Sequence, residues 1–191
     1  MILSLKKMII LSIVAILVSV TVAWGLKTLT GSEVFNPVNG ETTYGPIKLT
    51  MRLDKTSYRL GEPANITLAV TNISNETVLL GFSVLCKTSF VVCNKSSQTI
   101  FNYFSSVCWP DSGGEVVLDS GESLSQTLTW DQLEIDNFPP FASRQVQPGT
   151  YYIIGQTGPL LRYVGPREEY DPLECIDLIK IETPKVKIEI I

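Results

Sequence analysis

The sequence predicts an all-β protein, a single Ig-like antiparallel β-sandwich of about 8–9 strands that follows an N-terminal hydrophobic helix. Three observations support this class. Apolar and polar residues alternate with period two in several short segments, Gly, Pro and Asn turn signals separate these segments, and no long amphipathic helix follows residue 27. The 191 residues divide into a hydrophobic segment (1–27), a polar spacer (28–45) and one domain (46–191).

The N-terminal segment has the composition of a signal peptide or a membrane anchor. Two lysines, Lys6 and Lys7, precede residues 8–26, which carry no charged side chain. At about 1.5 Å per helical residue, such a run approaches the hydrocarbon thickness of about 30 Å. Cleavage and retention are both open. In either case the lysines favour the inner side, so we expect a protein outside the cytoplasm, either membrane-anchored or secreted.

Residues 28–45 mix Gly, Asn, Thr and Pro without a period, which is typical of a spacer. The apolar residues Val34, Phe35 and Val38 give this segment a second interpretation. They would allow it to add a strand to the sheet edge of a neighbouring molecule.

Period-two alternation is clearest at the start of the domain. Residues 47–53 alternate apolar and polar side chains, and residues 64–71 repeat the pattern, so both are predicted to be half-buried strands. Trp130 continues the inward-facing series of a later strand, so we expect it to pack in the core. The further predicted strands are residues 78–85, 89–93, 99–104, 114–118, 123–130, 150–155 and 185–191.

Four Asn-x-Ser/Thr triplets are glycosylation candidates, and they agree with an exterior location. Their asparagines are Asn65, Asn72, Asn75 and Asn94. Asn65 falls on the outward face of its predicted strand, where a glycan has room.

The even cysteine count favours disulfides over a zinc site, because no pair has Cys-x-x-Cys spacing and histidine is absent. The hairpin predicted to turn at residues 94–98 places Cys86 near Cys108, which makes this pair the first expectation. It leaves Cys93 to pair with Cys175. The alternative joins Cys86 to Cys93 and Cys108 to Cys175, and it stays open.

Composition excludes several classes of function. The formal net charge is −4 and the pI is about 4.9, so the chain offers no basic surface to nucleic acid. The absence of histidine removes the usual proton shuttle and the Ser-His and Cys-His nucleophile pairs. We expect no cofactor, no metal and no enzymatic activity. Calcium is a weaker alternative, since the acidic groups at 131–136 and 168–171 lack a recognised loop spacing.

Two irregular stretches, residues 131–148 and 156–172, are the candidate binding loops, because binding residues concentrate on loops held by rigid scaffolds. Aromatic and arginine residues near prolines fit a protein interface. In the alternative interpretation the phenylalanines cover the open end of the sandwich and the arginines are solvated. The candidate contact residues are Phe138, Phe141, Arg144, Arg162, Tyr163 and Tyr170.

Several segments, in this order, carry a family resemblance. They are YRLGEP from Tyr58 to Pro63, the strand ending at Asn72, residues 90–92 and 103–104, the DSGE turn at 119–122 leading to WDQ at 130–132, and PGTY at 148–151. Together these segments resemble the intracellular proteinase inhibitor (BsuPI) family over about residues 49–155. The resemblance implies a small β-sandwich whose named member inhibits a serine proteinase. It implies no inhibitory residue, because the matching positions look like scaffold.

These features favour a non-enzymatic, extracytoplasmic protein-binding module, for which the BsuPI-like form implies inhibition of a serine proteinase. Its partner would be another protein, either a proteinase or a cell-surface component, and the N-terminal segment would contact the membrane. Arg144 and Arg162 are the first residues to test for inhibition. The alternative is a structural subunit of a cell-surface layer or filament that assembles by strand addition.

Overall fold

The computed structural model describes residues 38–82, 85–108, 113–135, 143–158, 160–164 and 179–191. The chain divides into two compact units, Met1–Phe35 and Asn36–Ile191, and all described residues belong to the second. The hydrophobic segment 8–26 therefore lies outside the described residues. Within the part that is described, no helix has the length and apolar character needed to cross a bilayer.

The all-β class is confirmed. The described residues form fourteen strands and one short helix, which is more strands than the sequence predicted. The elements are β1 (Val38–Tyr44), β2 (Ile47–Leu53), β3 (Ser57–Tyr58), β4 (Ala64–Asn72), β5 (Val78–Phe82), β6 (Thr88–Asn94), β7 (Thr99–Asn102), α2 (Tyr103–Val107), β8 (Gly114–Leu118), β9 (Ser123–Trp130), β10 (Leu133–Ile135), β11 (Ser143–Gln145), β12 (Gly149–Thr157), β13 (Leu160–Val164) and β14 (Val186–Ile190).

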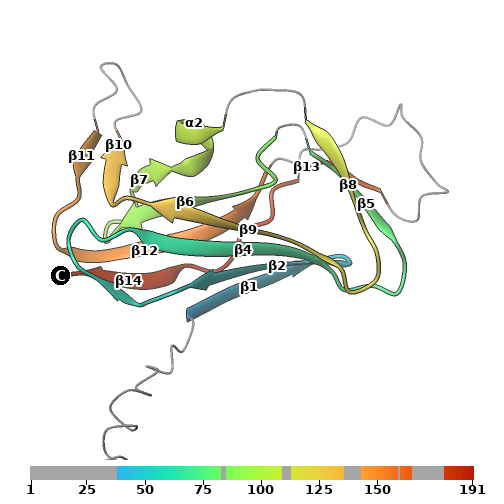
Figure 1. Ribbon diagram of the computed structural model, residues 1–191, viewed down its shortest axis with the longest axis horizontal. Helices are drawn as coiled ribbons and strands as arrows, with labels where there is room; N and C mark the ends of the chain where they lie inside the picture. The colour runs from blue at the N-terminus through green and yellow to red at the C-terminus, as the bar shows by residue number, and fades with distance from the viewer. Residues whose placement is uncertain (1–37, 83–84, 109–112, 136–142, 159, 165–178) are drawn as a thin grey trace, which may run out of the picture. The chain divides into compact units, whose positions relative to one another are not determined.

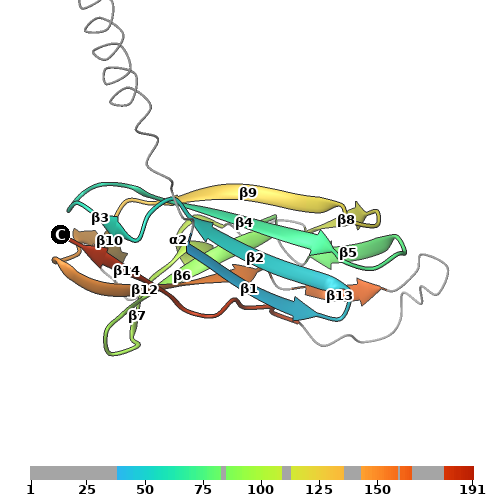
Figure 2. The same cartoon turned by 90° about the horizontal axis from the view of Figure 1, so that it is seen from below.

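Two sheets form the main layers (Figures 1 and 2). The first has the order β1-β2-β4-β9, and the second has the order β3-β14-β12-β6-β7. Both are antiparallel except where β14 pairs with β3. A three-stranded sheet, β13-β5-β8, and the hairpin β10-β11 complete the described strands. Figure 1 places β13 and the β10-β11 hairpin at opposite ends of the sandwich.

Alternating burial explains why the central strands pair as they do. Met51 in β2 lies opposite Leu68 in β4, and both side chains are fully buried. Gly155 in β12 faces them from the other sheet, and a Cβ added at Gly155 would collide with the Leu68 side chain. The absent side chain at position 155 therefore lets the two sheets approach closely. The resulting core is continuous and includes Trp130, which is buried as predicted.

The prediction of a spacer to residue 45 is wrong at its end. Residues Val38–Tyr44 form β1, which pairs along its whole length with β2 and turns at Gly45 with φ 54°. Edge-strand pairing needs backbone groups rather than apolar alternation, so the composition of the segment concealed it. Val38 is thus used within its own sheet, while Val34 and Phe35 lie outside the described residues.

Two further boundaries differ from the prediction. The strand expected at residues 78–85 ends at Phe82. The strand expected at 99–104 ends at Asn102, whose side chain caps α2 by accepting from the backbone N–H groups of Phe104 (3.0 Å) and Ser105 (3.4 Å). An Asn at this position starts a helical turn because it satisfies amides that have no partner inside the helix.

Candidate functional site

A buried glutamine joins segments that are far apart in the sequence. Gln132 follows β9, has a φ of 57° and is fully buried. Its Nε2 donates to the carbonyl oxygens of Arg59 (2.9 Å) and Glu62 (2.6 Å), and its Oε1 accepts from the backbone N–H of Gly61 (2.8 Å). One side chain therefore fixes three backbone groups of the turn between β3 and β4.

The turn at residues 59–62 is also closed by its own groups. The backbone N–H of Glu62 donates to the Arg59 carbonyl at 2.9 Å, and Gly61 has a φ of 80°, a combination typical of a type II turn. The Glu62 carboxylate accepts from the backbone N–H of Arg59 at 2.9 Å. The N–H of Leu60 donates to the carbonyl of Ile191 at 2.9 Å, which ties the turn to the C-terminal residue.

Charged and hydroxyl groups of the segment that precedes the turn stabilise it and the adjacent strand β3. Lys55 forms an ion pair with Glu62, and the hydrogen bond from Lys55 is the main reason that the pKa of Glu62 lies below its usual value. The Tyr58 hydroxyl donates to Asp54 Oδ1 at 2.7 Å. Burial, followed by this bond to Asp54, raises the pKa of Tyr58 well above its usual value. Tyr58 therefore stays a neutral donor at physiological pH.

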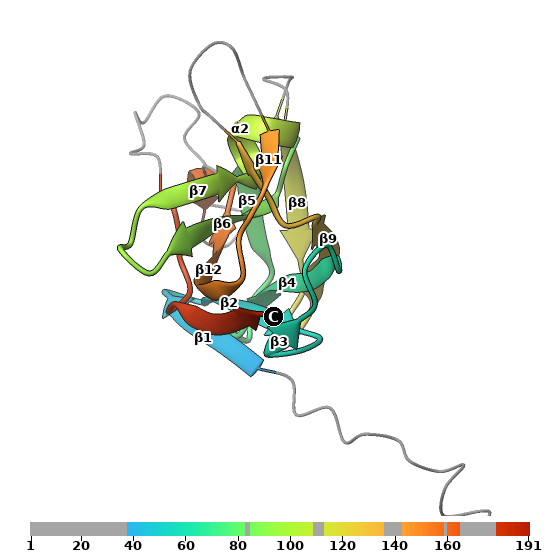
Figure 3. The same ribbon diagram turned by 90° about the vertical axis from the view of Figure 1, so that its left-hand side faces the viewer.

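The hairpin β10-β11 rises from the same place. The Trp130 indole N–H donates to the Leu133 carbonyl at 3.0 Å, and the Val146 N–H donates to the Gln132 carbonyl at 2.9 Å. On the hairpin surface, Arg144 makes two hydrogen bonds to Glu134, at 2.9 and 3.2 Å, which lower the pKa of that carboxyl group. Figure 3 looks onto this end of the sandwich, with β11 and the C-terminus towards the viewer.

Three side chains at this end form what we call the turn surface: Arg59, Leu60 and Ile191. Arg59 is exposed, Leu60 is 47% exposed and Ile191 is 70% exposed. The backbone beneath Leu60 and Ile191 is hydrogen-bonded, so these apolar groups face water from a fixed position. Apolar side chains held on a fixed backbone lose little conformational entropy when a partner covers them.

The sequence profile of a family described as intracellular proteinase inhibitor, BsuPI, matches residues 51–157, which is more than half of the chain. The chain belongs to the BsuPI family. The matched region of this BsuPI protein contains Gln132, the 59–62 turn and the β10-β11 hairpin. Among the site residues, Ile191 lies beyond it.

Other comparisons add little to the family match. No curated protein matches the BsuPI chain significantly. Among solved structures, a β-glucosidase from Listeria innocua in complex with glucose is 14% identical with a TM-score of 0.39, covering 75% of this chain and 16% of that one. A β-glucosidase from Erythrobacter marinus is 12% identical with a TM-score of 0.39, covering 81% of this chain and 16% of that one. The C-terminal domain of wzt is 6% identical with a TM-score of 0.42, covering 82% of this chain and 78% of that one. None of these similarities bears on function.

Family membership bears on two of the expectations from the sequence, the class of function and the location of the protein. A proteinase-inhibitor family implies a non-enzymatic protein whose partner is a protein, a proteinase. The expected location outside the cytoplasm, membrane-anchored or secreted, is wrong, because the family is described as intracellular. That expectation came from residues 8–26, which lie outside the described residues.

One disulfide matches the pair that the predicted hairpin register favoured. Cys86 and Cys108 form a disulfide with a Cα–Cα distance of 6.0 Å. Cys93, in contrast, is a buried free thiol on β6, with its Sγ 3.8 Å from the Thr99 hydroxyl. This differs from the expected bond to Cys175, and Cys175 itself lies outside the described residues.

The predicted binding loops are not brought together. Arg144 lies on β11, whereas Arg162 and Tyr163 lie on β13, which pairs with β5 in another sheet. The remaining candidates, Phe138, Phe141 and Tyr170, lie outside the described residues.

One of the four sequon asparagines is unsuitable for a glycan. Asn72 is fully buried, and its Nδ2 donates to the carbonyls of Glu76 (2.6 Å) and Leu118 (2.9 Å), so the nitrogen that would carry a glycan is already used. Asn65 and Asn75 are exposed, and Asn94 is half-buried. Their modification would require an exterior location, which the family description contradicts.

Sequence reasoning missed Arg59, Leu60 and Ile191 as surface residues and gave Gln132 no role. The available signal was the pair of segments Tyr58–Pro63 and Trp130–Gln132, which were interpreted as scaffold. In the structure they contact each other through Gln132.

Proposed function

We propose that this BsuPI protein inhibits a serine proteinase by docking its turn surface, Arg59, Leu60 and Ile191, against the enzyme. The main support for this proposal is the set of three hydrogen bonds made by the Gln132 side chain, which hold an exposed turn in one conformation. A preorganised turn loses little conformational entropy on binding, so its contacts contribute more fully to affinity. Arginine is also enriched among the residues that dominate binding energy at interfaces.

The turn geometry supports a particular mode of inhibition. An extended peptide binds a protein cleft by pairing its backbone as an added strand. The 59–62 turn is closed by the bond from Glu62 N–H to the Arg59 carbonyl, and that carbonyl also accepts from Gln132. Its backbone groups are therefore engaged within the inhibitor. The turn would obstruct the enzyme as a folded projection and would not be cleaved as a substrate.

The hairpin residue Arg144 takes a secondary place in this proposal. Its side chain is 68% exposed, but its guanidinium group is bound to Glu134. Exposed ion pairs of this kind contribute little to binding when they lie at the rim of an interface. We therefore place Arg144 at the rim and the turn surface at the centre.

The experiment that tests the proposal incubates the full chain with subtilisin and follows both enzyme activity and the integrity of the inhibitor. We expect inhibition at micromolar protein, with the peptide bonds of residues 59–62 intact by mass spectrometry after prolonged incubation. A subtilisin that retains full activity would contradict the inhibitory function. Inhibition accompanied by cleavage within residues 59–62 would contradict the folded-projection mode.

A further inference from the structure

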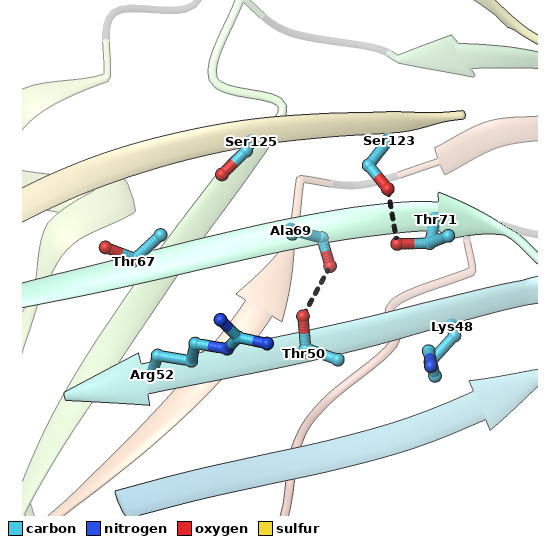
Figure 4. Close-up of a pocket in the computed structure, with 8 residues that line it drawn as sticks. All are labelled: Lys48, Thr50, Arg52, Thr67, Ala69, Thr71, Ser123 and Ser125. Atoms are coloured by element: carbon cyan, nitrogen blue, oxygen red, sulfur yellow. Dashed lines mark hydrogen bonds between the residues drawn. The ribbon is translucent and has the colours of Figure 1, made fainter. Parts of the chain in front are cut away.

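The outer face of the first sheet carries a hollow of about 330 Å³, and none of the turn-surface residues lines it. It lies over β2, β4 and β9 (Figure 4). Lys48 and Arg52 on β2 border it, with Thr50 between them. The other strands contribute short side chains, mainly serine and threonine.

The sheet register explains why the surface is hollow here. Thr50, Ala69 and Ser125 lie opposite one another on three adjacent strands. Ala69 and Ser125 are small, so the middle of the sheet face is low. The neighbouring row contains Thr71 and Ser123, which lie opposite each other on β4 and β9. Their side chains are held in place, because the two hydroxyl groups are hydrogen-bonded to each other at 2.8 Å.

The lining contains hydroxyl groups and two cations. No carboxylate lines the hollow, although Glu41 on β1 is exposed and lies opposite Thr50 in the register. Within the described part of the chain, neither the Lys48 ammonium nor the Arg52 guanidinium group forms an ion pair. Two cations without an anion are notable in a chain whose formal net charge is −4.

These features point to an anionic ligand. Ammonium and guanidinium groups bind phosphate and carboxylate oxygens through charge-assisted hydrogen bonds, which are stronger than bonds between neutral groups. A row of hydroxyls adds donors and acceptors that suit a ligand bearing hydroxyl groups of its own. The volume is at the lower end of the range for small-molecule sites, about 300–1,000 Å³.

We propose that this hollow is a second binding site, which takes a small hydroxylated oxyanion such as a sugar phosphate. Arg52 and Lys48 would hold the anionic group, and Thr50 and Ser125 would contact the hydroxylated part over Ala69. The site goes beyond proteinase inhibition, and it does not depend on it. An acidic protein segment is the competing occupant, and the experiment separates the two.

The test is an NMR titration of the isotope-labelled full chain with glucose 6-phosphate, glucose, inorganic phosphate and a short poly-glutamate peptide. We expect saturable amide shifts at Thr50, Ala69 and Ser125 with glucose 6-phosphate at about 0.1–10 mM. Inorganic phosphate should bind more weakly, and glucose should give no saturable shift. Tighter binding of poly-glutamate than of glucose 6-phosphate at these residues would overturn the proposal, and so would equal affinity for inorganic phosphate.

Three variants locate the binding. Replacing Ala69→Leu fills the floor of the hollow and leaves both cations, so it should abolish the saturable shifts. The double variant Lys48→Gln and Arg52→Gln should weaken binding at least about tenfold. Lys185→Gln removes an exposed lysine near β14, outside this sheet, and should leave the affinity unchanged. Equal weakening by Lys185→Gln, or unchanged affinity in Ala69→Leu, would show that binding is not in the hollow.

Discussion

The side-chain amide of Gln132 donates to the carbonyl oxygen of Arg59 at 2.9 Å, across 73 positions of sequence. The same side chain accepts from Gly61 and donates to Glu62, so the exposed turn and the base of the β10-β11 hairpin form one hydrogen-bonded unit. The affinity of the turn surface for a proteinase should therefore depend on a buried residue that cannot touch the enzyme.

Replacing Gln132→Ala removes all three of these side-chain bonds. Because polar backbone groups are left without their partner, we expect a loss of about 2–3 kcal/mol in the free energy of unfolding, measured by urea denaturation. Gln145→Ala is the control, since the Gln145 amide donates to the Gln132 carbonyl from the exposed strand β11. It should cost less than about 1 kcal/mol. Equal losses in the two variants would show that Gln132 is not the centre of the cluster.

The turn at residues 119–122 has the same geometry as the turn at residues 59–62, and each contains one glycine with a positive φ. Gly61 has a φ of 80° and Gly121 has a φ of 77°, and each precedes a glutamate that closes the turn in the same way. Nothing lies near an added Cβ at either position, so alanine should cost about 1 kcal/mol of backbone strain at each. Both variants should be destabilised alike in urea, but inhibition should weaken in Gly61→Ala alone. Weaker inhibition in both, or in neither, would contradict the assignment of the turn surface.

Acid should destabilise the protein through Glu62. The hydrogen bond from Lys55, followed by that from the Arg59 N–H, holds the pKa of Glu62 below its usual 4.5 in the folded state. The carboxylate's contribution is therefore complete above pH 4.5 and is lost as the pH falls through the lower, folded-state pKa. Glu62→Gln should flatten the fall of stability with pH in this window, as measured by urea midpoints.

Lys55→Met should weaken the same dependence, because it removes the largest cause of the shift. Lys185→Met, which changes a lysine far from the turn in sequence, should keep the dependence of the parent protein. An unaltered acid dependence in Glu62→Gln would contradict the assignment.

Reduction of the Cys86–Cys108 disulfide should lower stability. The bond joins residues 22 positions apart and closes a loop that contains β6, β7 and α2. Constraining a loop of this length in the unfolded chain is worth about 3 kcal/mol. Dithiothreitol and the double variant Cys86→Ser and Cys108→Ser should shift the urea midpoint equally, and reductant should have no further effect on the variant. Cys93→Ala should remain sensitive to reductant, and loss of that sensitivity would contradict the pairing.

The sequence predicted the strands whose side chains alternate between core and solvent. Strands β2 and β4 were located within one residue, because period two reports burial directly. Strand β1 pairs through its backbone and shows no such alternation, so it was interpreted as a spacer. The short strands β10 and β11 are exposed or half-buried, and their side chains carry no periodic signal either.

The candidate site was harder to predict than the fold. The contacts of Gln132 connect residues about 70 positions apart, and the turn they fix belongs to a segment that was interpreted only as scaffold. Ile191 joins the turn surface through the hydrogen bond from the Leu60 N–H to its carbonyl, which no local pattern indicates. The hairpin register, in contrast, was local, and it led to the Cys86–Cys108 pair that the structure contains.

Docking through the turn surface is tested most directly by the inhibition constant of Leu60→Asp for subtilisin. The control is Ser120→Asp, which places the same charge at the equivalent position of the second turn. Both positions are exposed, so Leu60→Asp should keep the stability of the parent protein. Ser120→Asp should lose about 1 kcal/mol, because it removes the hydrogen bond from the Ser120 hydroxyl to the Ser74 carbonyl at 2.7 Å. We predict that Leu60→Asp raises the inhibition constant at least about 100-fold, as expected for a central interface residue, and that Ser120→Asp leaves it unchanged. An unchanged constant in Leu60→Asp, with a loss of inhibition in Ser120→Asp or Arg144→Glu, would contradict docking through the turn surface.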